Sequence, residues 1–191
     1  MEMWDLDWPG RRSFERRLVK KCFPDSSFSE IGTPCFTCLV GGGGRINNYK
    51  QRLDLSYGFP DRGPDLYIEY PRILPMRDGR TINSLGTSSQ YHVFDNGPQG
   101  EVKICYGLDW NASFTCIMPL IRGVIWIDGY ENHLRTGETI ASFIDRFRKK
   151  LEAASQNRSG IIQMPFTETN LHRFADTLRI QPHNLIQQIA Y

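Results

Sequence analysis

A single cysteine stands at the end of a short apolar stretch, where a thiol is easily exposed. Cys105 closes "EVKIC", and His92 lies on the other arm of a hairpin that the Asn-Gly pair in "DNGPQG" predicts. The thiolate of a cysteine is the nucleophile of acyl-transfer reactions, whereas a lone cysteine is most often a small buried core residue. The residues around Cys105 therefore leave a reactive thiol and a structural thiol both open.

Two other motifs indicate structure rather than chemistry. "CFTC" at 35–38 is the one C-x-x-C pair, and the four histidines supply no second pair of zinc ligands at matching spacing. Cys35 and Cys38 lie in one predicted strand and face opposite sides of it, so we expect core cysteines and no metal site. "GGGG" at 41–44 lacks the Gly-Lys-Ser/Thr ending of a phosphate-binding loop and is interpreted as a flexible hairpin connection.

Positive charge is concentrated near the N-terminus, although the net charge of the chain is only +2. The segment 11–21 holds six Lys or Arg residues, and Arg12, Arg16 and Lys20 line one face of a predicted amphipathic helix. This face fits a docking surface for a partner or an ordinary solvated helix face. The segment 168–191 has the outline of a helix-turn-helix with few base-reading side chains, so we favour two packing helices over nucleic-acid binding.

The elements that must position these residues follow from the hydrophobic periodicity. In chain order we predict a helix at 11–23, strands at 35–40, 49–60 and 65–71, a loop at 76–90, a strand pair within 91–107, a helix at 114–134 interrupted near Pro119, and a helix at 136–155. Strands and helices are segregated, which is typical of an α+β domain. We expect one domain over 11–155 and a helical extension over 156–191.

The composition bounds the setting. No apolar run is long enough to span a bilayer, and the segment 1–12 lacks the apolar region of a signal peptide. We therefore expect a cytoplasmic protein that does not bind membranes. The five cysteines are then expected to be reduced, and their odd number argues against a disulfide framework.

Four segments occur in an order that is similar to that of a known family. They are "YGFPDRGPDLYIEYP" (57–71), "YHVFDNGPQGEVKICY" (91–106), "WNASFT" (110–115) and "GYENHLRTGETI" (129–140). Together with the basic helix before them, the series over 11–152 resembles the ubiquitin-conjugating enzyme fold. It is closest to the bacterial relatives found in CBASS-like or Bil-like anti-phage operons. The resemblance implies an N-terminal helix, an antiparallel four-stranded meander and C-terminal helices.

The resemblance also implies an activity. Cys105 would accept the C-terminal glycine of a ubiquitin-like protein, or of a cGAS-like nucleotidyltransferase, as a thioester from an activating enzyme. It would then transfer this acyl group to a target protein, in anti-phage defence and without a cofactor. By the same resemblance, the helix face of Arg12, Arg16 and Lys20 would face the activating enzyme.

The resemblance assigns roles near the thiol as well. His92 would orient the site by hydrogen-bonding the backbone around Cys105, and Trp110 would pack beneath the active-site loop. The His-Pro-Asn motif of the eukaryotic family is replaced here by "HVFDN". Asn96 is therefore a shifted candidate for the asparagine that stabilises the oxyanion, provided that the hairpin folds back to Cys105. Two alternatives stay open: a non-catalytic adaptor with the same fold, and a nucleic-acid-binding protein that uses the C-terminal helix pair.

Overall fold

The computed structural model describes residues 10–41, 45–55, 58–107 and 110–156, with side chains up to residue 150. The elements in chain order are α2 (Arg11–Cys22), β1 (Ser27–Ser29), β2 (Cys35–Val40), β3 (Tyr49–Asp54), β4 (Asp65–Tyr70), the 3₁₀ turn η1 (Ile82–Ser84), β5 (Val102–Ile104), α3 (Ile117–Thr136) and α4 (Ile140–Gln156). The strands precede α3 and α4, and the predicted α+β class is confirmed. The predicted helical pair at 168–191 lies outside the described residues.

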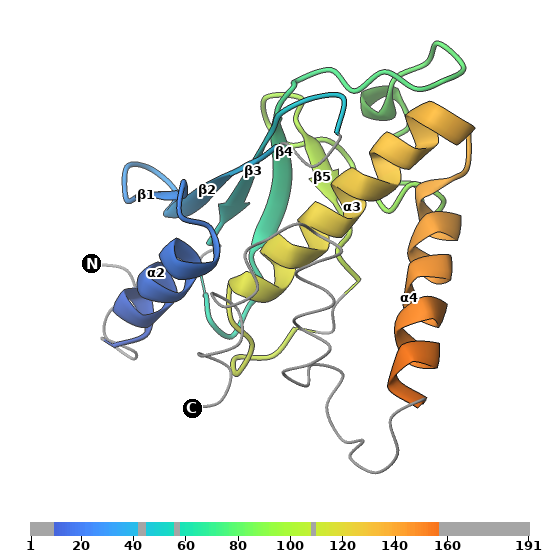
Figure 1. Ribbon diagram of the computed structural model, residues 1–191. Helices are drawn as coiled ribbons and strands as arrows, with labels where there is room; N and C mark the ends of the chain where they lie inside the picture. The colour runs from blue at the N-terminus through green and yellow to red at the C-terminus, as the bar shows by residue number, and fades with distance from the viewer. Residues whose placement is uncertain (1–9, 42–44, 56–57, 108–109, 157–191) are drawn as a thin grey trace.

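The strands form one antiparallel meander in the order β1-β2-β3-β4-β5 (Figure 1). The sheet has five strands where the resemblance implied four. The additional strand, β1, has only three residues, which is too short for an alternating pattern to reveal. Cys35 and Cys38 lie in β2, half-buried and buried respectively, as their opposite faces predicted.

The predicted strand before "DNGPQG" does not form as a regular strand. His92 takes a left-handed backbone conformation with φ of 49°, which interrupts an extended chain. Val93 instead makes isolated bridges to Ser88 on one side and to Ile104 on the other. The hairpin pairing that the Asn-Gly signal predicted is therefore present, but only β5 is a strand.

The helix α3 lies across one face of the sheet, and α4 packs beside α3 (Figure 1). The expected interruption at Pro119 is absent, because α3 begins at Ile117 and Pro119 falls in its first turn. Amide groups of a first turn have no intrahelical acceptor, so a proline there removes no hydrogen bond. Gly137 ends the helix in a left-handed conformation and donates its N–H to the carbonyl of His133.

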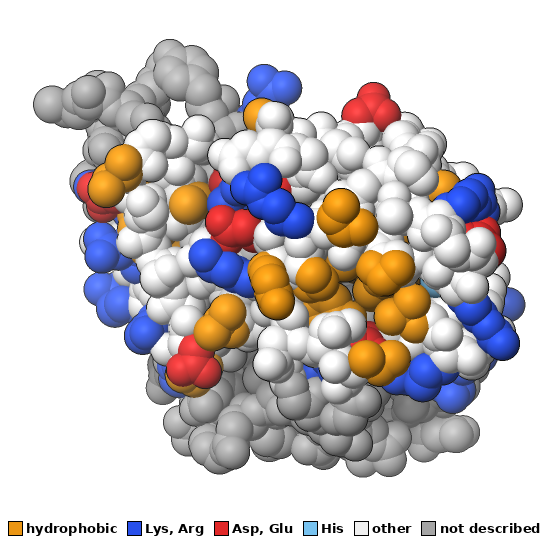
Figure 2. Space-filling model, turned by 90° about the horizontal axis from the view of Figure 1, so that it is seen from above, with side chains coloured by type: hydrophobic (Ala, Val, Ile, Leu, Met, Phe, Trp, Pro, Cys, Tyr) orange, Lys and Arg blue, Asp and Glu red, His pale blue; other side chains and the backbone are white. Residues whose placement is uncertain are grey.

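Exposed apolar side chains lie at the end of the sheet where β2 and β4 finish. Figure 2 views the molecule from above and shows apolar side chains gathered on this face among Lys and Arg. Leu39, Ile46, Tyr70 and Ile73 are each at least 60% exposed. Cys105 follows the opposite end of β5, since Ile104 pairs with Leu66 near the start of β4. The thiol and this apolar surface are therefore separate features.

A glycine sets how closely α3 approaches the sheet. A Cβ added at Gly123 would lie 2.2 Å from the side-chain oxygen of Gln51 and 2.9 Å from Cδ2 of Leu66. Gln51 is fully buried on β3 and donates to the carbonyl of Leu120 at 3.3 Å. The helix therefore rests on a buried polar side chain that leaves no space for a methyl group.

We expect Gly123→Ala to lower the free energy of unfolding by about 1–3 kcal/mol, the range for overpacking a core. Urea denaturation followed by tryptophan fluorescence measures this change. The Gln51→Ala/Gly123→Ala double variant should lose less than the sum of the two single losses, because the clashing oxygen is gone. Gly10→Ala is the control, since its added Cβ meets nothing within 4 Å. Strict additivity of the two changes would contradict the packing.

Candidate active site

Cys105 directly follows β5 and is half-buried. Its backbone N–H donates to the carbonyl of His92 at 2.8 Å, and the next pair along the hairpin is Val93 with Ile104. The structure places His92 on the other arm of the hairpin from Cys105, as the sequence analysis expected. The contact comes from the main chain of His92, and among the described residues its imidazole makes no hydrogen bond.

Three consecutive carbonyls on the hairpin arm opposite Cys105 each accept a hydrogen bond from a different part of the chain. The carbonyl of Gln90 accepts the N–H of Ala141 on α4 at 2.9 Å. The carbonyl of Tyr91 accepts the indole N–H of Trp126 on α3 at 2.8 Å, and that of His92 accepts Cys105. These contacts fix the direction of the chain that lies against Cys105. They also hold His92 in its left-handed conformation, which is uncommon for a residue with a Cβ.

The chain after the thiol is held by an arginine from α3. Nη1 of Arg122 donates to the carbonyl of Tyr106 at 2.7 Å and to that of Gly107 at 2.6 Å. Arg122 is half-buried, and this burial lowers its pKa from the ordinary arginine value. The phenol of Tyr106 donates to the carbonyl of Pro64 at 2.7 Å, and burial raises its pKa to about 12. Cys105 is therefore anchored on both sides by main-chain contacts.

Trp110 packs on the β3–β4 connection. Its indole N–H donates to the carbonyl of Pro60 at 2.6 Å, and its ring lies 5.9 Å from that of Phe59 and 6.1 Å from that of Phe114. Its Cβ lies 3.1 Å from the position that a Cβ would take at Gly63, so a methyl group there would force the ring to shift. Trp110 thus joins the segment after the thiol to a neighbouring loop, which is a structural role.

Asn96 does not reach Cys105. Its side-chain amide donates to the carbonyl of Asn83 at 2.8 Å, and the side chain is exposed. The hairpin arms run away from the thiol, and Gly97 donates to the carbonyl of Glu101, four residues or about 13 Å of strand before Cys105. Glu101 in turn pairs with Arg52 on the outer side of β3 at 2.9 Å. The condition set for Asn96 as an oxyanion donor is therefore not met.

The three basic residues predicted for partner docking lie on α2 and also contact the chain that follows it. Arg12 and Arg16 lie 3.2 Å and 3.4 Å from the carboxylate of Glu30. Lys20 donates to the carbonyl of Ser26 at 3.0 Å. The side chain of Arg16 is about half exposed, so this face still presents positive charge to solvent.

A buried ion pair that the sequence reasoning missed joins α2 to the start of α3. Glu15 is 1% exposed, pairs with Arg11 at 2.8 Å and accepts the backbone N–H of Cys116 at 2.9 Å. Arg11 also donates to the carbonyls of Ala112 and Phe114. Burial raises the pKa of Glu15, which these donors counteract. The signal in the sequence is the four-residue spacing of Arg11 and Glu15, but it does not reveal burial.

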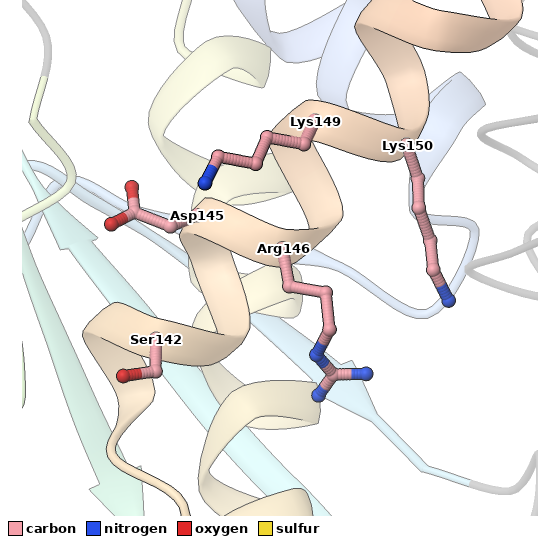
Figure 3. A pocket seen from close by; sticks show the side chains of 5 residues that line it. All are labelled: Ser142, Asp145, Arg146, Lys149 and Lys150. Atoms are coloured by element: carbon pink, nitrogen blue, oxygen red, sulfur yellow. The ribbon is translucent and has the colours of Figure 1, made fainter.

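A shallow recess with mostly positive charge lies along α4 (Figure 3). The residues that line it are Ser142, Asp145, Arg146, Lys149 and Lys150. Figure 3 shows Asp145 and Lys149 extending to one side of the helix and Arg146 and Lys150 to the other. Asp145 also acts on His92: burial lowers the pKa of this imidazole, and the negative charge of Asp145 partly opposes that shift.

Comparison with known proteins identifies no relative: no protein-family model, curated protein or solved structure matches the chain. Within the described ranges, none of the helices has the length and apolar character to cross a membrane. In the same part of the chain, no three side chains of metal-binding type gather. The chemistry of the site therefore has to be argued from its geometry.

We expect His92→Asn to make the protein less sensitive to mild acid. Because burial lowers the pKa of His92, the unfolded chain binds its proton at a higher pH than the folded protein. The wild type should therefore lose stability relative to His92→Asn as the pH falls below the ordinary histidine value of about 6.5. Asparagine tolerates the left-handed conformation and does not titrate.

Urea unfolding at several pH values between about 7.5 and 5.5 measures this difference. The other ionisable groups are present in both proteins, so their contributions cancel. A difference between the two free energies of unfolding that stays constant with pH would contradict the depressed pKa of His92.

Proposed function

We propose that the protein is a thioester-forming acyltransferase of the ubiquitin-conjugating kind, with Cys105 as its nucleophile. The observation that carries this proposal is the place of the thiol, half-buried at the end of β5 with the backbone held on both sides. Thioester exchange needs a positioned thiolate and a positioned acyl donor more than it needs an acid or a base. A rigid main chain around the sulfur supplies the first of these.

The other four thiols are less suited to attack. Burial raises the pKa of Cys22 to about 11 and that of Cys38 to about 12, and it raises that of Cys116 well above the usual value. Cys35 is half-buried, but desolvation and the nearby carboxylates of Asp54 and Glu69 raise its pKa. Because the thiolate is the attacking species, these environments disfavour the four as nucleophiles.

The proposed reaction passes an acyl group between sulfurs. The Cys105 thiolate attacks the carbonyl carbon of a C-terminal glycine that is held as a thioester on an activating enzyme. A new carbon–sulfur bond forms, the old one breaks, and the activating enzyme leaves as a thiolate. The acyl group then passes to a nucleophile on a target protein. We propose a ubiquitin-like protein or a cGAS-like nucleotidyltransferase as the donor, in a bacterial anti-phage setting within the cytoplasm.

Support for this setting comes from the sequence resemblance and from the order of the elements. A basic N-terminal helix, an antiparallel meander and two later helices follow one another as the resemblance implies. A non-catalytic adaptor would show the same order of elements. The reactivity of Cys105 therefore distinguishes an acyltransferase from an adaptor. The nucleic-acid alternative depends on residues 168–191, which lie outside the described residues.

Wild-type protein incubated with ATP and any activating enzyme and acyl donor encoded in the same operon should form an adduct that reductant removes. Cys105→Ser should gain the same added mass as an ester that resists reductant, and Cys105→Ala should gain none. Cys35→Ser is the matched control and should behave as the wild type. Intact-protein mass spectrometry measures each adduct. A wild type that forms no reductant-sensitive adduct would support the adaptor alternative.

We expect reversal of the basic helix face to slow loading by the activating enzyme by at least tenfold. Replacing Arg12, Arg16 and Lys20 with Glu removes the positive face that the proposal assigns to this enzyme. The pairs with Glu30 are partly exposed and contribute only about 0–1 kcal/mol each, so the fold should persist. Single-turnover loading measures the rate, and Lys149→Glu/Lys150→Glu on α4 is the control. Equal slowing in both variants would indicate a general charge effect.

A further inference from the structure

The group that stabilises the oxyanion at Cys105 is not supplied by the side chains that the sequence indicated. Asn96 donates to the carbonyl of Asn83 on a hairpin that runs away from the thiol. The N–H of Cys105 itself is taken by the carbonyl of His92. Attack on a thioester nevertheless places negative charge on the carbonyl oxygen, and a fixed donor near that oxygen accelerates such reactions. The backbone that follows the sulfur offers another donor.

The N–H of Gly107 is directed away from Arg122. The carbonyl of Tyr106 points to Nη1 of Arg122, at 2.7 Å. In a trans peptide the C=O and the N–H of one unit point in opposite directions, so the N–H of Gly107 points to the other side of the chain. Among the described residues, nothing accepts a hydrogen bond from it.

The conformation of Gly107 is compatible with anion binding. Its φ is +57°, a left-handed value that glycine adopts without steric cost. Its own carbonyl also contacts Nη1 of Arg122, at 2.6 Å, so two successive carbonyls converge on one nitrogen. Turns that combine a right-handed and a left-handed residue direct successive N–H groups into a concavity that binds anions, and the φ of Gly107 fits the left-handed position of such a turn.

We propose that the N–H of Gly107 donates to the oxyanion formed at Cys105 and that Arg122 is the positioning residue that orients it. This inference rests on the proposed acyl transfer. The Cys105 thiolate adds to the carbonyl carbon, and the electron pair of the C=O bond moves to the oxygen, which accepts the hydrogen bond. The pair then returns, and the bond to the donor sulfur breaks to release a thiolate. In α/β-hydrolases the backbone N–H of the residue directly after the nucleophile serves the same purpose, whereas Gly107 lies two residues after Cys105.

Two reactions of the same thiol separate this role from a merely structural one. The thioester of N-acetylglycine with 2-mercaptoethanesulfonate reacts through an oxyanion. Iodoacetamide reacts at a saturated carbon and forms none. The ratio of the two rate constants at Cys105, measured by peptide mass spectrometry with Cys105→Ser as the blank, cancels changes in exposure and in thiolate fraction.

Arg122→Met should lower this ratio about tenfold to a hundredfold, somewhat less than the effect of deleting an oxyanion donor outright, because the N–H is misdirected rather than removed. Arg122→Lys should give an intermediate ratio, since an ammonium group lacks the planar fork of a guanidinium. If Arg122→Met has a lower melting temperature than the wild type and Arg122→Lys does not, only the ratio of Arg122→Lys tests the proposal. A decrease in that ratio supports the proposal, and an unchanged ratio overturns it.

Lys103→Met is the matched control. It removes a cation two residues before Cys105 that pairs with Asp65 at 2.8 Å and lies near the rings of Tyr67 and Phe94. The ratio should equal that of the wild type. An equal decrease in Lys103→Met, or a parallel loss of both rates in Arg122→Met, would overturn the proposal. No partner protein is in the assay, so failure to load from an activating enzyme would overturn the proposed function without changing this result.

Discussion

The burial of α3 is the constraint on which the rest of the structure depends. A helix enclosed by a sheet and a second helix must satisfy its polar side chains inside the protein, and α3 does so with the backbone of the surrounding loops. Arg122 binds the chain after Cys105, Trp126 binds the carbonyl of Tyr91, and Tyr130 donates to the carbonyl of Pro75 at 2.7 Å. A buried side-chain donor left without a partner would cost about 1–3 kcal/mol. Long segments without regular structure are therefore fixed in place.

Two buried carboxylates extend this arrangement to both ends of α3. Glu15 accepts the N–H of Cys116 just before the helix begins, and Arg11 neutralises its charge. Glu131, near the other end, is 1% exposed and accepts the phenol of Tyr49 at 2.6 Å and the N–H of Ile46 at 3.0 Å. Each carboxylate is buried only because several donors surround it. The helix is thereby tied to α2 at one end and to the start of β3 at the other.

The predictable parts are those encoded by local periodicity, and the missed parts depend on distant contacts. The helix at 11–23 and the strands at 35–40 and 65–71 follow from patterns within the segments themselves. The conformation of His92 depends on α3, α4 and Cys105, so no local pattern predicts it. Arg122 reads as one charge within an apolar helix, because its acceptors lie about fifteen residues earlier in the chain. The roles of Cys105 and His92 are implied by a resemblance and remain predictions, whereas the geometry does not meet the condition for Asn96.

The backbone around Cys105 is fixed on one side by His92, which has a strained conformation, and on the other side by Arg122. A residue with a Cβ at positive φ persists only where its surroundings enforce it, and such residues cluster at functional sites. The left-handed turn at His92 brings its carbonyl to the N–H of Cys105 and so fixes the chain before the sulfur. Arg122 fixes the chain after it and, in the role proposed above, leaves the N–H of Gly107 to the oxyanion. A thiol has an ordinary pKa of about 8.5, so a thiolate can leave without being protonated by a strong acid. The proposed thioester exchange therefore does not need an acidic side chain, and a site formed by main-chain groups is sufficient for it.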